Sequence, residues 1–74
     1  MSAITIEIFR TNVQRARDAI MLANVLFERM PGSHVSFDLD DCDKILRIQH
    51  SKVIATEITS LFQLHGFSCE VLED

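Results

Sequence analysis

Residues 4–9 read Ile-Thr-Ile-Glu-Ile-Phe, in which isoleucine occupies every second position. An alternation of this kind, rich in β-branched residues, predicts a half-buried β-strand, because successive side chains of a strand point to opposite faces. We expect the three isoleucines to face the core. The residues between them, ending with Phe9, are then expected on the opposite face.

Beyond this strand the spacing of the apolar residues changes. Between Val13 and Met30 they recur every three or four residues, which predicts an amphipathic helix of about five turns. Asn12 is a favourable N-cap, and Pro31 ends the helix because proline cannot continue its hydrogen-bond ladder. The predicted apolar stripe contains Val13, Ala16, Ile20, Ala23, Phe27 and Met30, joined on one side by Ala19 and Leu26.

The rest of the chain continues with strand, strand, helix and strand. Residues 35–39 and 44–49 alternate as strands, and the acidic residues 40–43 between them are typical of a turn. A second helix is expected after Ser51, with Gly66 just past its end. Its apolar stripe contains Ile54, Ile58, Leu61 and Phe62. Residues 68–72 form a short last strand.

The element order βαββαβ predicts an α+β fold. Each helix needs an apolar surface to cover, and the alternating strands offer one, so we expect a two-layer ferredoxin-like sandwich with both helices on one side of the sheet. Right-handed crossovers then give an antiparallel four-stranded sheet of order 4-1-3-2. With 74 residues the chain is expected to form a single domain, residues 1–74.

The composition excludes several classes of function. The chain carries a net charge of −4, its seven lysines and arginines are scattered, and its two glycines lie far apart, so neither a nucleic-acid surface nor a phosphate loop is expected. No apolar run approaches the roughly 20 residues of a membrane span. Without a secretory leader, the two cysteines are expected as reduced thiols in the cytoplasm.

Several segments are similar to the heavy-metal-associated domain family, the copper-chaperone-like fold. Residues 4–8 resemble the first strand of that family, and residues 35–37 and 45–48 resemble its central hairpin. The segment Leu64-His65-Gly66-Phe67 resembles the family's closing leucine-any-glycine-tyrosine motif before the last strand. The resemblance covers nearly the whole chain and implies the same βαββαβ fold.

The metal-binding motif of that family is missing from this sequence. A Cys-x-x-Cys pair is expected where the first loop meets the first helix, because Cu(I) prefers two thiolates. The aligned positions hold Val13 and Ala16, neither of which can donate a lone pair to a metal. Metal transfer therefore does not carry over, and these two residues are interpreted as the first apolar turn of the helix.

A displaced metal site is the alternative that the residues leave open. The topology brings the 40–43 turn, the first loop and the end of the second helix to one rim of the sheet, where Cys42, His65 and Cys69 are candidate ligands for copper or zinc. Cys42 and Cys69 belong to strands two spacings apart, roughly 9–10 Å, which is wide for a shared ion. No cofactor is therefore expected.

The favoured function is a non-catalytic interaction or regulatory module. Phe9, Ile45 and Leu72 are expected as apolar residues on the open side of the sheet, a surface suited to a protein partner or to self-association. Enzyme activity is not expected, because Cys42 and a histidine would be the one nucleophile–base pair and nothing would orient them. A small-molecule sensor of the amino-acid-binding (ACT-like) kind shares the element order and ranks third.

Overall fold

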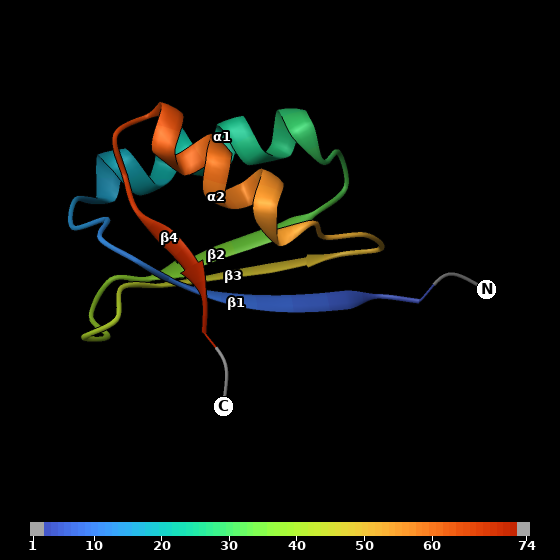
Figure 1. The fold of residues 1–74 in the computed structure, drawn as a ribbon, viewed down its shortest axis with the longest axis horizontal. Coiled ribbons are helices and arrows are strands. Elements are labelled where there is room, and N and C mark those ends of the chain that lie inside the picture. The colour runs from blue at the N-terminus through green and yellow to red at the C-terminus, as the bar shows by residue number, and fades with distance from the viewer. Residues whose placement is uncertain (1–2, 73–74) are drawn as a thin grey trace.

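The computed structural model of the chain describes residues 3–72, so residues 1–2 and 73–74 of the expected domain 1–74 lie outside the described residues. Four antiparallel strands and two helices follow one another in the expected order (Figure 1). The elements are β1 (Thr5–Thr11), α1 (Ala16–Arg29), β2 (His34–Asp38), β3 (Ile45–His50), α2 (Ala55–Leu64) and β4 (Cys69–Val71).

The four strands form one sheet, and both helices lie on the same side of it (Figure 1). Neighbouring strands are β2-β3-β1-β4; counted from the β4 edge, the same sheet reads 4-1-3-2. The central strands β3 and β1 therefore each have a partner on both sides. One face of the sheet is covered by the helices, and we call the other face the open face.

The register of β1 corrects one prediction. Phe9 lies opposite Leu46 of β3, and directly opposite residues in an antiparallel pair share a face. Leu46 is buried under the helices, so Phe9 is inside as well, with 0% of its surface exposed. The predicted open-face position of Phe9 is therefore wrong, and so is the predicted burial of the isoleucines.

Hydrogen bonds at the end of β1 fix this register. The backbone N–H of Thr11 donates to the Asp43 carbonyl at 3.0 Å, and its hydroxyl donates to the Lys44 carbonyl at 2.6 Å. The same hydroxyl oxygen accepts the Val13 N–H at 3.2 Å. Thr11 is buried, so these polar groups have no water to replace a lost partner. A one-residue shift of β1 would break the two bonds to Asp43 and Lys44.

Helix α1 also buries a different stripe from the one predicted. Ala19, Leu22 and Leu26 face the sheet, whereas Ile20 and Phe27 are exposed. Two apolar stripes of helical spacing run along this helix one residue apart, and spacing alone does not say which of them meets the sheet. The expectation for Ala19 and Leu26 is confirmed, and the expectation for Ile20 and Phe27 is wrong.

Neither predicted N-cap residue caps a helix. The N-cap positions are Arg15 for α1 and Ile54 for α2, and neither makes a side-chain capping bond. Asn12 instead accepts the backbone N–H of Ser68 at 2.9 Å, which joins the loop before α1 to the loop after α2. Ser51 lies three residues before the N-cap of α2, in the connection that follows β3.

The end of α2 follows the prediction. Gly66 has a φ of +85°, a conformation that glycine adopts without strain. Its N–H donates to Gln63 at 3.0 Å, and the N–H of Phe67 donates to Phe62 at 2.9 Å. This pair of bonds is a Schellman motif, which satisfies carbonyls left free at the helix end.

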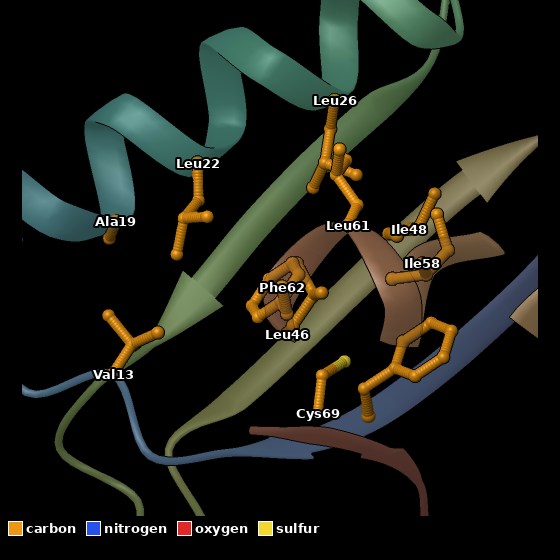
Figure 2. Close-up of a cluster of buried hydrophobic side chains, with 11 residues drawn as sticks. Val13, Ala19, Leu22, Leu26, Leu46, Ile48, Ile58, Leu61, Phe62 and Cys69 are labelled. Carbon is orange, nitrogen blue, oxygen red and sulfur yellow. The ribbon is translucent and has the colours of Figure 1, made fainter. Parts of the chain in front are cut away.

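The core lies between the helices and the covered face of the sheet (Figure 2). Phe62 of α2 occupies its middle, with its ring 6.4 Å from that of Phe37. All elements except β2 contribute buried apolar residues, and β2 contributes partly buried ones. The buried set is Phe9, Val13, Ala19, Leu22, Leu26, Leu46, Ile48, Ile58, Leu61, Phe62 and Cys69.

The register of β1 predicts that substituting Phe9 lowers the free energy of unfolding far more than substituting Ile6 does. Phe9→Ala should lower the free energy of unfolding by about 3–5 kcal/mol, since it leaves a cavity in the core. Ile6→Thr, which keeps the β-branch on an exposed position, should cost less than about 1 kcal/mol. Urea unfolding followed by circular dichroism measures both values. The reverse ranking would show that the isoleucines face the core.

Candidate functional site

The open face carries a mixed set of side chains from all four strands. Because side chains alternate along a strand, the residues that flank the buried ones in sequence point to this face. Cross-strand pairing aligns them in rows, one of which runs Ser36, Arg47, Ile8 and Leu72. The described open-face residues are Ile4, Ile6, Ile8, Arg10, His34, Ser36, Asp38, Ile45, Arg47, Gln49, Glu70 and Leu72.

Three isoleucines form the apolar centre of this face. Ile4, Ile6 and Ile8 follow one another along β1 and its entry, and they are 63%, 47% and 36% exposed. We call them the isoleucine column. The N–H of Leu72 donates to the Ile8 carbonyl at 2.9 Å, which places the half-buried Leu72 beside the column. A row of large apolar side chains on an inner strand is a typical binding surface.

Two of the three predicted interaction residues lie on this face. Ile45 and Leu72 are half-buried there, whereas Phe9 belongs to the core. The sequence pattern did not predict the isoleucine column on the open face, although the position of Arg10 indicates it. Arg10 falls in the same alternation as the isoleucines once the strand is continued to Thr11. Burying the isoleucines would therefore bury a guanidinium as well, at a large desolvation cost.

Charged side chains lie at one end of the open face. The Arg10 guanidinium lies 3.4 Å from an Asp43 oxygen and 3.3 Å from a Glu70 oxygen. These pairs are well exposed, so each contributes little to stability. They do hold Arg10 across β1, between the β2–β3 turn and β4. Arg47 lies in the middle of the face, opposite Ile8 on one side and Ser36 on the other.

The loops at this end of the sheet meet at a rim, as the topology predicts. The bonds from Thr11 join β1 to the β2–β3 turn, and the bond between Asn12 and Ser68 joins the first loop to the start of β4. The three candidate ligands nevertheless have different surroundings. Cys42 is exposed in the turn and His65 is exposed at the end of α2. Cys69 points from β4 into the core (Figure 2).

The environment of Cys69 suits a core residue better than a ligand or a nucleophile. Burial, with a smaller contribution from Glu70, raises the pKa of this thiol from 9.0 to about 12. The thiolate is the form that binds metals and attacks electrophiles, so the buried thiol is inert at neutral pH. Its side chain instead packs in the cluster with Phe62 and Leu46.

Within residues 3–72, one group of side chains has the spacing of a metal site. Donor atoms of Asp41, Cys42 and Asp43 lie within 4.8 Å of one another, and neither His65 nor Cys69 belongs to the group. Contacts within the turn and with Arg10 also account for the closeness of these side chains. Asp41 accepts the backbone N–H of Asp43 at 2.8 Å, a bond typical of a tight turn, while Asp43 contacts Arg10.

Val13 and Ala16 align with the Cys-x-x-Cys pair of heavy-metal-associated domains, and they have different surroundings in this structure. Val13 lies in the loop before α1 and is completely buried, where it closes the end of the core. Ala16 is the first residue of α1 and is exposed. The interpretation of both as one apolar helical turn is therefore wrong. Val13 precedes the helix, and Ala16 faces solvent.

The surface of the described residues also has three hollows, two of which include residues of the open face. One of about 330 Å³ lies between the end of α1 and α2, and includes Met30, Leu61 and the exposed Leu64. Another of about 380 Å³ lies at the β2 edge, beside Phe27 and His34. A third of about 610 Å³ lies beside β4, around Thr11, Asn12 and Gln63. Their linings mix polar and apolar side chains, and the third includes the ion pair of Arg10 and Glu70.

Neither described helix is long and apolar enough to span a bilayer. Comparison of the chain with protein-family models, with curated proteins and with solved structures gives no match.

The two cysteines should differ strongly in reactivity. At neutral pH, iodoacetamide should modify Cys42 in the native protein, and Cys69 only after unfolding, because a pKa near 12 instead of 9.0 lowers the thiolate fraction about 1000-fold. Intact-mass spectrometry over time gives the number of modified thiols. The Cys42→Ser variant should remain unmodified until urea is added. Rapid modification of that variant would contradict the buried position of Cys69.

Proposed function

We propose that this chain is a small non-catalytic interaction or regulatory module that binds a protein through the open face of its sheet. The isoleucine column is the observation that carries the proposal. Removing apolar surface from water contributes about 25 cal/mol per Å², and β1 with the residue before it presents three outward isoleucines at alternate positions that the fold itself leaves partly exposed. A partner covering the column would gain that free energy.

The fold of the proposed module is ferredoxin-like and of the heavy-metal-associated kind, without that family's metal chemistry. Element order, strand pairing and the glycine-ended second helix support the comparison. The buried Val13 supports the loss of the metal site, because its side chain belongs to the core. We infer that the loop which carries ligands in that family has a structural role in this chain.

The face fits a protein better than a single-stranded nucleic acid. Stacking on bases uses aromatic side chains on the sheet surface, and the burial of Phe9 leaves His34, on the edge strand β2, as the one aromatic ring among the described residues of the open face. Its two arginines are matched by Asp38 and Glu70, so the face offers no excess positive charge for phosphates.

The proposal can be tested by photo-crosslinking in cells of the organism that encodes the chain. A photoreactive amino acid at Ile6 should give a discrete adduct, because this position lies in the centre of the face. The same residue at Leu64, 78% exposed on α2, is the matched control and should give none. Adding Ile8→Glu should abolish the adduct at Ile6. Equal labelling from both positions, or none from Ile6, would overturn the proposal.

A second candidate function is metal binding at the tip of the β2–β3 turn, where Asp41, Cys42 and Asp43 group their donor atoms. Of the three predicted ligands, this site would use Cys42 but not His65 or Cys69. Titration with Zn²⁺ and Cu(I), followed by calorimetry, should give stoichiometric binding that Cys42→Ser abolishes and Cys69→Ala retains. Weak binding that is equal in both variants would rule this site out.

A further inference from the structure

We propose that the free edge of β2 binds an extended segment of another protein, which pairs with β2 and adds a strand to the sheet. The site lies at the sheet edge beside α1, away from the isoleucine column on β1. The proposal therefore goes beyond the function proposed above and does not depend on it. Three features of the described residues carry it: unpaired backbone groups, an apolar wall on α1 and an acidic end.

One hydrogen bond fixes the direction of bonding across the sheet. The backbone N–H of Leu72 donates to the Ile8 carbonyl at 2.9 Å, so the backbone groups of Ile8 face β4. Bonding direction alternates along an antiparallel strand, which turns the groups of Phe9 toward β3. Phe9 is paired with Leu46, so the groups of Leu46 face β1 and those of its neighbour Arg47 face β2.

The same alternation leaves two residues of β2 unbonded at the sheet edge. Ser36 is paired with Arg47 and bonds to β3, so the N–H and C=O groups of its neighbours Val35 and Phe37 point away from the sheet. β2 is an edge strand, and these groups have no other hydrogen-bond partner within residues 3–72. An extended chain matches such a row, because its own N–H and C=O groups have the same spacing.

The β2 edge lacks the features that usually prevent strand addition. β2 pairs with β3 through all five of its residues without a bulge, and it contains no proline or lysine. β4, at the other edge of the sheet, is three residues long. A hollow of about 380 Å³ opens at the β2 edge, between Phe27 of α1 and Val35 and Ser36 of β2. The edge of β2 is therefore the one that offers room for a strand.

Helix α1 supplies an apolar wall beside this edge. Phe27 is 42% exposed and lines the hollow together with the half-buried Val35. Ile20, two turns earlier on the same side of α1, is 63% exposed. Residues of an added strand that lie opposite Val35 and Phe37 place their side chains on this helix side, and the residues between them point to the open side. The occupant is therefore a segment in which apolar and polar residues alternate.

The charge at one end of the edge selects a basic residue. Asp38 ends β2, Asp40 follows it in the turn, and both are exposed. Neither has an ion-pair partner among the described residues, whereas Asp43 is held by Arg10. A lysine or arginine at the corresponding end of the segment would lie next to these carboxylates. β2 contains neither residue type, so β2 of a second copy does not supply this charge.

Selection from a library of random peptides of about 12 residues, long enough for one strand, tests the proposal. The enriched peptides should alternate apolar and polar residues and have a lysine or arginine at one end. Phe27→Glu should abolish binding of an enriched peptide in fluorescence anisotropy, because it places a charge on the apolar wall. Leu64→Glu puts the same charge on an exposed leucine of α2 and, as the matched control, should bind like the wild type. Circular dichroism checks that both variants are folded.

Two further measurements separate strand addition from binding through side chains alone. Val35→Pro removes an outward N–H without breaking a bond to β3, and should weaken peptide binding about tenfold. Hydrogen exchange needs no variant. In the wild-type protein the amides of residues 35 and 37 should exchange fast, and slowly once the peptide is bound. The amide of residue 36 should exchange slowly in both states.

Several outcomes would overturn the proposal. They are a selection that yields no binder, enriched peptides without alternation, binding that Phe27→Glu retains, and unchanged exchange at residues 35 and 37. Self-association that Val35→Pro abolishes would also overturn it, because a second copy would then occupy the edge. None of these results decides the proposed function, which is measured by the photo-crosslink at Ile6 on the open face.

Discussion

The hydrogen bonds of Thr11 are the constraint on which the rest of this structure depends. Its N–H and hydroxyl bind the carbonyls of Asp43 and Lys44, and its hydroxyl oxygen accepts the Val13 N–H. The residue is buried, so each bond that is lost leaves an unsatisfied polar group, at about 1–3 kcal/mol each. The end of β1 is thereby held at one register against the start of β3.

This register decides both faces of the sheet. With Thr11 next to the turn, Phe9 lies opposite Leu46 and enters the core, and the alternation turns the isoleucines outward. A shift of one residue would exchange the two sets and bury Arg10. The core and the open face are therefore two consequences of the same few bonds. The candidate interaction surface exists because the fold selects Phe9 over the isoleucines for burial.

The same end of the sheet holds Val13, Asn12 and the two cysteines in different surroundings. Val13 lies two residues after Thr11 and is buried in the core, while Asn12 accepts the backbone N–H of Ser68 and so joins the two loops. Cys69 enters the core from β4, and burial holds its thiol protonated. Cys42 lies with Asp41 and Asp43 at the tip of the turn, apart from His65 and Cys69. The rim is therefore a structural junction between loops, and the exposed apolar surface lies on the sheet.

The sequence by itself determined the number, type and order of the elements. Alternation in residues 4–9, helical spacing after Val13, the acidic turn and Gly66 each report a local property of the chain. The alternation along the last two strands also predicted Ile45 and Leu72 on the open face. Both lie there, half-buried, next to more buried neighbours in sequence.

The tertiary structure alone decided which face of each element is buried. Alternation shows that two faces of a strand differ, and spacing shows the same for a helix, but neither says which one meets the core. For β1 the answer comes from Thr11, which binds residues more than 30 positions away. For α1, burial of Leu22 in place of Ile20 depends on the sheet beneath it. These contacts are non-local, and a local pattern carries no record of them.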